Sequence, residues 1–237
     1  MNLSVVMPAH NEAALLESSV EEVVSGLRAR GEPFEVIVVE NGSQDATPAI
    51  ASRLATEHSE VRVDTLTRAD YGRALRTGLL TATGDVVVNF DVDYTDLGFL
   101  DAVVVRLGQA EPPAIIVGSK RAPGAQDQRS RPRRFVTWTF SLVLRLGFGL
   151  RVSDTHGMKA QNRNLVLPLA QACRSHGELF DTELILRAER AGLRVEELPV
   201  TVAERRPSRT SITRRALRTL VGLVRLRVTL ARSLRRG

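Results

Sequence analysis

Short apolar runs rich in β-branched residues alternate with amphipathic helical patterns through the first half of this 237-residue chain. Each run is apolar almost throughout, as strands are when helices cover both faces of a sheet. Strand–helix alternation of this kind predicts an α/β fold with a doubly wound, mostly parallel, Rossmann-like sheet. The expected strands are residues 3–7, 35–40, 61–66, 85–91 and 114–118, and the expected helices are 12–30, 46–58, 72–83 and 97–110.

The second half of the chain has a different pattern. Residues 126–134 are polar and rich in arginine, which predicts a mobile loop. Beyond it we expect helices over 135–150, 162–173, 180–191 and 213–234, and a last strand over 194–202. We therefore expect one domain over residues 1–211, followed by a basic amphipathic C-terminal helix over 212–237.

Charge is divided unevenly between the two halves. Residues 1–120 carry 9 basic and 18 acidic side chains, whereas residues 121–237 carry 24 basic and 9 acidic ones. A strongly basic half indicates an anionic partner, which could be phosphate, a membrane surface or nucleic acid. We expect no nucleic-acid partner, because the arginines are not interleaved with aromatic residues and no recognition motif is present.

Other features bear on the compartment. The single cysteine, Cys173, excludes a disulfide framework and a cysteine-based zinc site. Residues 1–7 lack the basic segment of a secretory signal, and no stretch offers 18 uncharged apolar residues. We therefore expect a cytoplasmic protein without a membrane-spanning helix.

Polar clusters follow three of the expected strands, at residues 8–12, 40–45 and 91–93. Parallel strands bring their carboxyl ends to one edge of the sheet, and ligands of such sheets bind there. Taken singly, these residues could serve as helix caps or turns, as Asn11 and Asp45 would. Their convergence predicts a binding site at this edge.

The third cluster contains two carboxylates at the end of an apolar strand. Asp91 and Asp93 are spaced so that, on a strand, both side chains point the same way. Their mutual repulsion is relieved by a hard divalent cation, which also bridges to a diphosphate. The pattern predicts a Mg²⁺ or Mn²⁺ site that neutralises the leaving group of a nucleoside diphosphate sugar.

Several longer motifs occur in a fixed order. They are S-V-V-M-P-A-H-N-E at 4–12, V-V-E-N-G-S-Q-D-A-T at 38–47, G-R-A-L-R-T-G at 72–78, G-S-K-R at 118–121, D-T-H-G-M-K at 154–159 and F-D-T-E at 180–183. The series resembles glycosyltransferase family 2, which has the GT-A fold. Within that family it is most similar to the dolichyl-phosphate mannose synthase and polyprenyl-phosphate glycosyltransferase group, over residues 2–211.

The resemblance implies a metal-dependent, inverting hexosyltransferase. Arg121 would stabilise the leaving diphosphate, because a guanidinium matches phosphate oxygens in a bidentate way. Asp93, Arg121 and Asp181 are the implied catalytic residues, and Asp91 and Asp93 the implied metal ligands. The residues implied to bind the donor are Pro8, Ala9, Glu12, Val39, Glu40, Asp91, Val92 and Asp93.

Four positions depart from the family pattern. Glu40 and Asn41 stand where the family has paired aspartates, which leaves the nucleobase preference open. His10 replaces an aromatic residue, and Thr95 replaces a glutamine that often helps to bind the metal. Asp96 or water would then take the place of that glutamine. A sugar-nucleotide binder without catalytic activity is an alternative on these grounds.

The resemblance also implies a lipid acceptor. Arg134 and Arg209 would hold the phosphate of a polyprenyl or dolichyl phosphate, with GDP-mannose as the favoured donor. An acceptor phosphate is already an anion and needs no strong general base. The alternative is a family 2 enzyme that uses another nucleotide sugar and a hydroxyl acceptor, with Asp154 or Asp181 as the base.

The C-terminal helix has a basic and an apolar side. Arg214, Arg218, Arg225, Arg232 and Arg236 fall on one side, and Leu217, Leu220, Val224, Val228, Ala231 and Leu234 on the other. Such a helix lies in an anionic membrane surface or packs on its own domain. Members of the group often carry membrane-spanning helices after this point. We therefore expect a peripheral protein on the cytoplasmic face of a membrane, with a membrane-anchoring partner protein as a further expectation.

Overall fold

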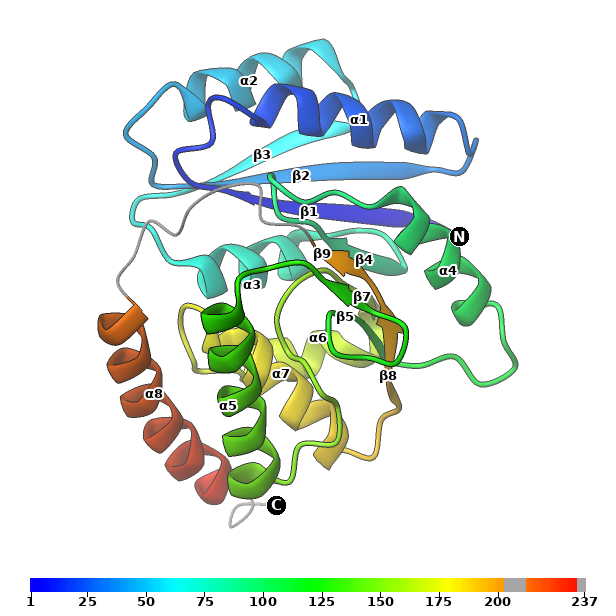
Figure 1. Cartoon of the computed structure of the whole chain (residues 1–237). Helices are drawn as coiled ribbons and strands as arrows, with labels where there is room; N and C mark the ends of the chain where they lie inside the picture. The colour runs from blue at the N-terminus through cyan, green and yellow to red at the C-terminus, as the bar shows by residue number, and fades with distance from the viewer. Residues whose placement is uncertain (203–211, 234–237) are drawn as a thin grey trace.

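The computed structural model describes residues 1–202 and 212–233 and is built on a seven-stranded sheet of order β3-β2-β1-β4-β7-β5-β8 (Figure 1). All neighbouring strands are parallel except β7, which runs antiparallel to both β4 and β5. The strands are β1 (Leu3–Ala9), β2 (Phe34–Asn41), β3 (Val61–Leu66), β4 (Val86–Asn89), β5 (Ile115–Ser119), β7 (Lys159–Asn162) and β8 (Val195–Pro199).

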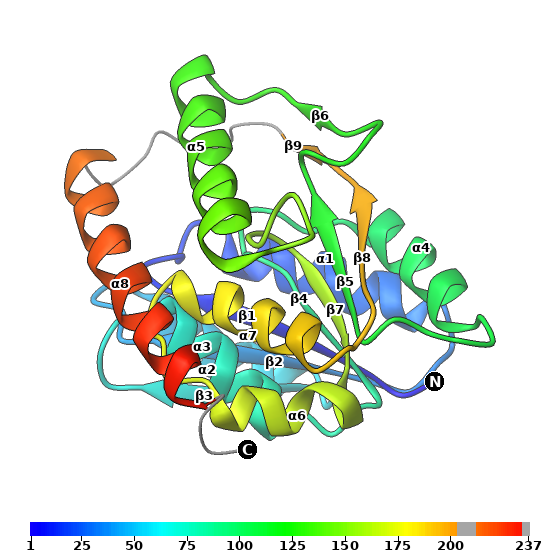
Figure 2. The same ribbon diagram turned by 90° about the horizontal axis from the view of Figure 1, so that it is seen from below.

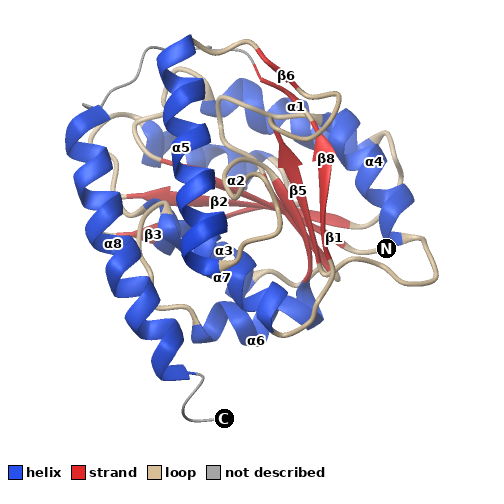
Figure 3. Ribbon diagram, turned by 60° about the horizontal axis from the view of Figure 1, so that its bottom comes forward, coloured by secondary structure: helices blue, strands red, loops and turns tan. Residues whose placement is uncertain are grey.

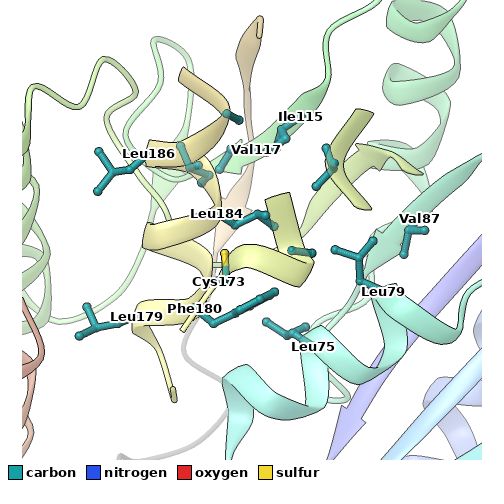
Figure 4. Close-up of a cluster of buried hydrophobic side chains, with 14 of the residues drawn as sticks. Leu75, Leu79, Val87, Ile115, Val117, Cys173, Leu179, Phe180, Leu184 and Leu186 are labelled. Carbon is teal, nitrogen blue, oxygen red and sulfur yellow. The ribbon is translucent and has the colours of Figure 1, made fainter. Parts of the chain in front are cut away.

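Helices cover both faces of this sheet (Figure 3). One face packs on α1 (Leu16–Arg28), α2 (Thr47–Glu57) and α4 (Leu97–Leu107), and the other on α3 (Tyr71–Thr81), α6 (Arg163–Ala172) and α7 (Leu179–Arg190). Alternate residues of each strand enter the two cores, as the period of a strand requires: Val5 lies in the first and Val6 in the second. Figure 4 shows the second core, where Phe180 packs between α7 and α3.

The strand order creates a topological switch point beside the middle of the sheet. The chain runs from β1 outward through β2 to β3 and then returns to β4 on the opposite side of β1. Loops that leave the carboxyl ends of β1 and β4 therefore diverge, and such a switch point is where doubly wound sheets bind ligands. The predicted doubly wound, mostly parallel α/β fold is confirmed.

Several predicted boundaries shift for local reasons. The helix expected from residue 12 begins at Leu16, because Glu12 to Leu15 form a turn closed by a 3.0 Å bond from the Leu15 N–H to the Glu12 carbonyl. The strand expected over 85–91 ends at Asn89. Strand β7 was not predicted, because its sequence, K-A-Q-N, lacks an apolar run.

The arginine-rich segment is more ordered than expected. Its first residues form β6 (Gln126–Asp127), which pairs with β9 (Thr201–Val202), and α5 (Arg131–Phe148) begins four residues later with a proline in its first turn. The expectation of a loop over 126–134 is therefore wrong. Arg134 lies inside α5 rather than before it.

Helix α8 (Ile212–Ser233) packs on its own domain and lies beside α5 (Figure 1, Figure 2). Leu223, Leu226 and Leu230 are buried in the core shared with α7, and Arg227 donates to the carbonyl of Gly147 at the end of α5. These leucines form the side of α8 that faces the domain. Val224 and Val228, which belong to the predicted apolar side, are exposed, so α8 has apolar residues on two sides.

Across residues 1–202 and 212–233, no helix combines the length and the apolar character needed to cross a bilayer.

Candidate active site

The loops that follow β1 and β2 are tied to each other by side chains. The Asn11 carboxamide oxygen accepts from the Gln44 N–H at 2.8 Å, and the Asn11 N–H donates to the Ser43 hydroxyl at 3.0 Å. Asp45 accepts from the Ala13 N–H at 3.2 Å. Asn11 adopts a φ of 55°, a left-handed conformation that asparagine tolerates. These residues therefore join two loops rather than only capping the next helix.

The residues predicted to line the nucleoside pocket come together at this edge. Pro8 pairs with Val39 and Ala9 with Glu40 in the β1–β2 ladder. The side chains of Ala9 and Val39 lie in the two cores, so a ligand would meet their main chain. The Glu40 side chain is buried and accepts from the Ser43 N–H at 2.6 Å. Glu12 follows at the start of the adjoining turn.

His10 and Asn41, two of the residues that depart from the family pattern, connect the loop after β2 with its neighbours at this edge. The His10 Nδ1 lies 2.8 Å from the Asn41 carbonyl oxygen, so that nitrogen carries the proton. The Asn41 carboxamide oxygen accepts from the Asp70 N–H at 2.8 Å. Asp70 caps α3 and also accepts from the Gly177 N–H at 2.8 Å, just before α7. The asparagine in place of an aspartate thus links the loops after β1, β2 and β3.

Asp91 and Asp93 lie in a tight turn after β4 rather than on the strand. A bridge between Asp91 and Tyr94 closes this turn. The Tyr71 hydroxyl donates to Asp91 Oδ1 at 2.8 Å. Burial raises the pKa of Asp91, and the charge of Asp93 raises it further. Two neighbouring carboxylates that repel one another are a donor set that fits a divalent cation.

Both candidates for a third metal ligand also make contacts within the protein. The Thr95 hydroxyl is buried and donates to Glu22 on α1 at 2.9 Å. Asp96 accepts from the Phe99 N–H at 3.0 Å and caps α4. Val92, between the two aspartates, is buried in the core beside α1 and α4, so it offers only main-chain groups to a ligand.

The chain's two lysines lie beside this turn and were given no role from the sequence. Lys159 Nζ is 2.8 Å from Asp181 Oδ2, and Lys120 Nζ is 2.9 Å from Asp154 Oδ2. In the sequence they stand out because lysine is rare: all the other residues among the 33 lysines and arginines are arginines. Tyr71, a third residue of the site, gave no such signal.

The two paired aspartates differ in their electrostatics. Burial raises the pKa of Asp181 to about 6, although the charge of Lys159 opposes the rise. Burial acts the same way on Asp154, but Lys120 and His156 outweigh it and leave the pKa of Asp154 below its ordinary value. Both side chains are 2% exposed. Asp181 therefore lies in the first turn of α7 as an ion-pair partner rather than as its cap.

Residues 154–157 connect the parts of the site that come late in the sequence. Besides the Asp154–Lys120 pair, Thr155 shares a 3.0 Å hydroxyl–hydroxyl bond with Thr182 on α7. The His156 ring contacts Phe140 on α5 with centroids 5.2 Å apart. This segment, the 154–157 loop, thus joins α5, α7 and the turn after β5.

Arg121 follows β5, whose carboxyl end lies on the same edge as that of β4. Its N–H donates to the Ser119 hydroxyl at 3.1 Å, which fixes the turn. Within residues 1–202 and 212–233, no hydrogen-bond partner reaches its buried Nε. A guanidinium held in this way is suited to a phosphate ligand.

The two predicted acceptor arginines are placed differently. Arg134 is exposed on the first turns of α5. Arg209 lies outside the described residues. Asp91, Asp93 and Arg121 are brought to one edge of the sheet, and Asp181 reaches it through Lys159.

Comparisons with known proteins agree with this geometry. A family model described as "Glycosyl transferase family 2" matches residues 4–167. Glycosyltransferase AglD of Haloferax volcanii is 36% identical over 205 residues, which span 84% of this chain but 33% of that protein. A dolichyl-phosphate beta-glucosyltransferase of Drosophila melanogaster is 31% identical over 220 residues, which span 86% of this chain and 68% of that protein.

A solved structure has the same architecture. Glucosyl-3-phosphoglycerate synthase from Mycobacterium tuberculosis, in complex with Mn²⁺, UDP-glucose and phosphoglyceric acid, matches with a TM-score of 0.65 and 26% identity. The match covers 87% of this chain and 73% of that one. Sheet order, motif positions and sequence matches lead to one conclusion: the chain belongs to glycosyl transferase family 2.

Proposed function

We propose that this protein transfers a hexose from a nucleotide sugar to a polyprenyl phosphate with inversion at the anomeric carbon. The names of its relatives support the acceptor, since the Drosophila protein is a dolichyl-phosphate glucosyltransferase. The charge distribution supports it too, because the half of the chain after residue 120 is strongly basic.

One observation carries the proposal. Both carboxylates that could serve as a general base are buried and paired with lysines, at 2.8 Å for Asp181 and 2.9 Å for Asp154. A hydroxyl acceptor needs such a base to take its proton, whereas a phosphate monoester attacks as an anion. The site is therefore better suited to a phosphate acceptor, which cations must dock beside the like-charged donor.

In this scheme Asp91 and Asp93 would hold Mg²⁺ or Mn²⁺, which supplies charge neutralisation for the donor diphosphate. Arg121 adds a second positive charge to the diphosphate as it leaves. The acceptor oxygen approaches the anomeric carbon from the opposite face of the sugar, and Arg134 and Arg209 are the proposed anchors of its phosphate. Tyr71 keeps Asp91 in place through its hydroxyl.

The donor is the finer part of the proposal. The sequence resemblance favours GDP-mannose, whereas the names of the relatives and the ligand of the solved structure favour glucose and UDP. The test is a transfer assay with GDP-mannose, UDP-glucose and dTDP-sugars, each with Mn²⁺ or Mg²⁺, and a short-chain polyprenyl phosphate. We expect a chloroform-soluble glycolipid from one donor class. Sugar release into water alone would contradict lipid transfer.

A second candidate is transfer to a hydroxyl, and one observation favours it. The pKa of Asp181 is raised to about 6 by burial, in the range where a carboxylate can act as a base. An assay of the wild-type protein and Asp181→Asn with a soluble acceptor such as phosphoglyceric acid distinguishes the two candidate functions. Hydroxyl transfer predicts activity on that acceptor and its loss in the variant, whereas phosphate transfer predicts no activity on it in either protein.

The protein is also proposed to work at the cytoplasmic face of a membrane. The outer side of α5 exposes large apolar residues, with Phe135 at 65% and Leu146 at 81%, and α8 exposes Val224 at 62% beside them. Exposed arginines, among them Arg134 and Arg225, flank these side chains. We call this surface the α5–α8 ridge. Anionic head groups contribute about 1 kcal/mol per nearby basic residue, so several arginines give appreciable binding.

We predict that the protein floats with liposomes that contain anionic lipid at low salt and dissociates as salt rises, because screening weakens each contact. Leu146→Asp should reduce flotation severalfold at the same salt, since it places a charge on the α5–α8 ridge. The matched control is Val105→Asp on α4, where the valine is 70% exposed and distant in the fold. Equal flotation of both variants would contradict membrane binding through the ridge, and a need for a second protein would show a membrane-anchoring partner.

A further inference from the structure

The Lys159 side chain is fully buried beside the site. Its ammonium donates to the Gly157 carbonyl at 2.6 Å and to the Thr155 carbonyl at 3.3 Å. It also lies 2.8 Å from Asp181 Oδ2 in an ion pair. A buried ion pair contributes little net stability, because the loss of hydration offsets the attraction. Stability alone thus does not account for a lysine here.

In the sheet, Lys159 lies next to the end of β4, the strand that leads to Asp91 and Asp93. Lys159 opens β7 directly opposite Asn89 of β4, two residues before Asp91. The Asn89 carboxamide donates to the Gly157 carbonyl at 3.3 Å, the same oxygen that Lys159 holds. The positive charge of Lys159 also acts on Asp91. The lysine is therefore bonded to the segment that supports the end of β4.

Two of the Lys159 bonds also fix the 154–157 loop. That loop leads to Lys120, next to Arg121, through Asp154, and to α5 through His156. Gly157 has a φ of 101°, a conformation that favours glycine, so its carbonyl can face the lysine. One buried ammonium thus connects the turn that carries Asp91 with the turn that carries Arg121.

We propose that Lys159 is a positioning residue of the donor site, which holds the end of β4 and the 154–157 loop so that Asp91 and Asp93 bind a divalent cation together with the donor diphosphate. The inference rests on the function proposed above. The removal of residues that orient metal ligands without touching the metal typically lowers metal affinity by about tenfold to a hundredfold. Lys159 should act in this way although it touches neither substrate.

The test measures binding and stability separately. Calorimetry gives the affinity for whichever of GDP and UDP binds the wild-type protein more tightly with Mn²⁺, and thermal unfolding gives Tm. Lys159→Met leaves Asp181 unpaired, so its Tm should fall. Lys159→Met/Asp181→Asn removes both charges, so most of the Tm should return. We expect Mn²⁺-dependent nucleotide binding to stay about tenfold to a hundredfold weaker in both variants.

A matched control comes from α7, the helix that carries Asp181. Arg187 pairs with the buried Glu183 at 2.7 Å on α7, so Arg187→Met should lower Tm and leave nucleotide binding unchanged. Wild-type affinity in the double variant would overturn the proposal, because the pair would then serve only packing. If the single variant does not fold, the double variant still decides. Absence of Mn²⁺-dependent binding in the wild-type protein would instead count against the proposed function.

Discussion

Asp93→Ala should reduce sugar transfer by about a thousandfold or more, since a catalytic metal supplies several kcal/mol of charge stabilisation and each 1.4 kcal/mol is a factor of ten. Its carboxylate lies two residues after Asp91 in the turn that follows β4. Mn²⁺ should raise the Tm of the wild-type protein and not that of the variant, because the variant lacks one of the two proposed metal ligands. Initial rates and Tm with and without Mn²⁺ measure both effects.

The control for this variant is Asp96→Ala. Asp96 caps α4 through a 3.0 Å bond to the Phe99 N–H, so its loss should cost about 1 kcal/mol of stability. Its metal response should remain that of the wild-type protein. Normal transfer by Asp93→Ala, or undiminished activity of the wild-type protein in excess chelator, would show that the turn does not hold a metal. A lost metal response in Asp96→Ala would move the third ligand to that residue.

Arg121→Ala should lower kcat by about a hundredfold to a thousandfold while the donor affinity changes little, as expected for a group that stabilises charge developing in the transition state. The guanidinium follows β5 and has a buried Nε without a partner in the described parts of the chain. Arg121→Lys should recover only part of kcat, because an ammonium cannot bind two phosphate oxygens in a planar way. Steady-state kinetics with varied donor measures kcat and KM.

Arg129→Ala is the matched control for this second variant. Arg129 lies in the same connection, but its guanidinium already pairs with Asp127 at 2.7 Å. We expect its kcat to stay within a few fold of the wild-type value. A loss confined to KM in Arg121→Ala would show that Arg121 contributes to ground-state binding alone.

The fold was predictable because its signal is local and repeated. Apolar β-branched runs mark the first strands, and the turn motifs at their ends mark the edge of the sheet that carries both Asn11 and Asp91. Strand β7 escaped this reasoning because it buries a lysine, and burial of a lysine depends on partners elsewhere in the chain. No local sequence pattern predicts the ion pair between Lys159 on β7 and Asp181 on α7.

In the helical second half, too, local sequence predicts the helices but not how they pack. The amphipathic character of α8 was evident, but it has two apolar sides, and its packing against α7, where Gly222 lies close to Leu179, decides which side is buried. Likewise, local sequence offered helix capping as the alternative role of Asn11 and Asp45. Their bonds across the two loops depend on how β1 lies beside β2.

The antiparallel strand β7 separates the sheet into two parts, and this division has an evolutionary consequence. Every residue proposed to bind the sugar nucleotide or its metal lies at or before Asp93, apart from Arg121, and every residue proposed to hold the acceptor lies after Lys120. A single recombination event between those positions would exchange the acceptor half and keep Asp91 and Asp93, but it would also replace Arg121 and Lys159. A change of acceptor by this route would therefore keep the donor only if the incoming half supplied its own equivalents of Arg121 and of the Lys159–Asp181 pair, both of whose members lie in that half.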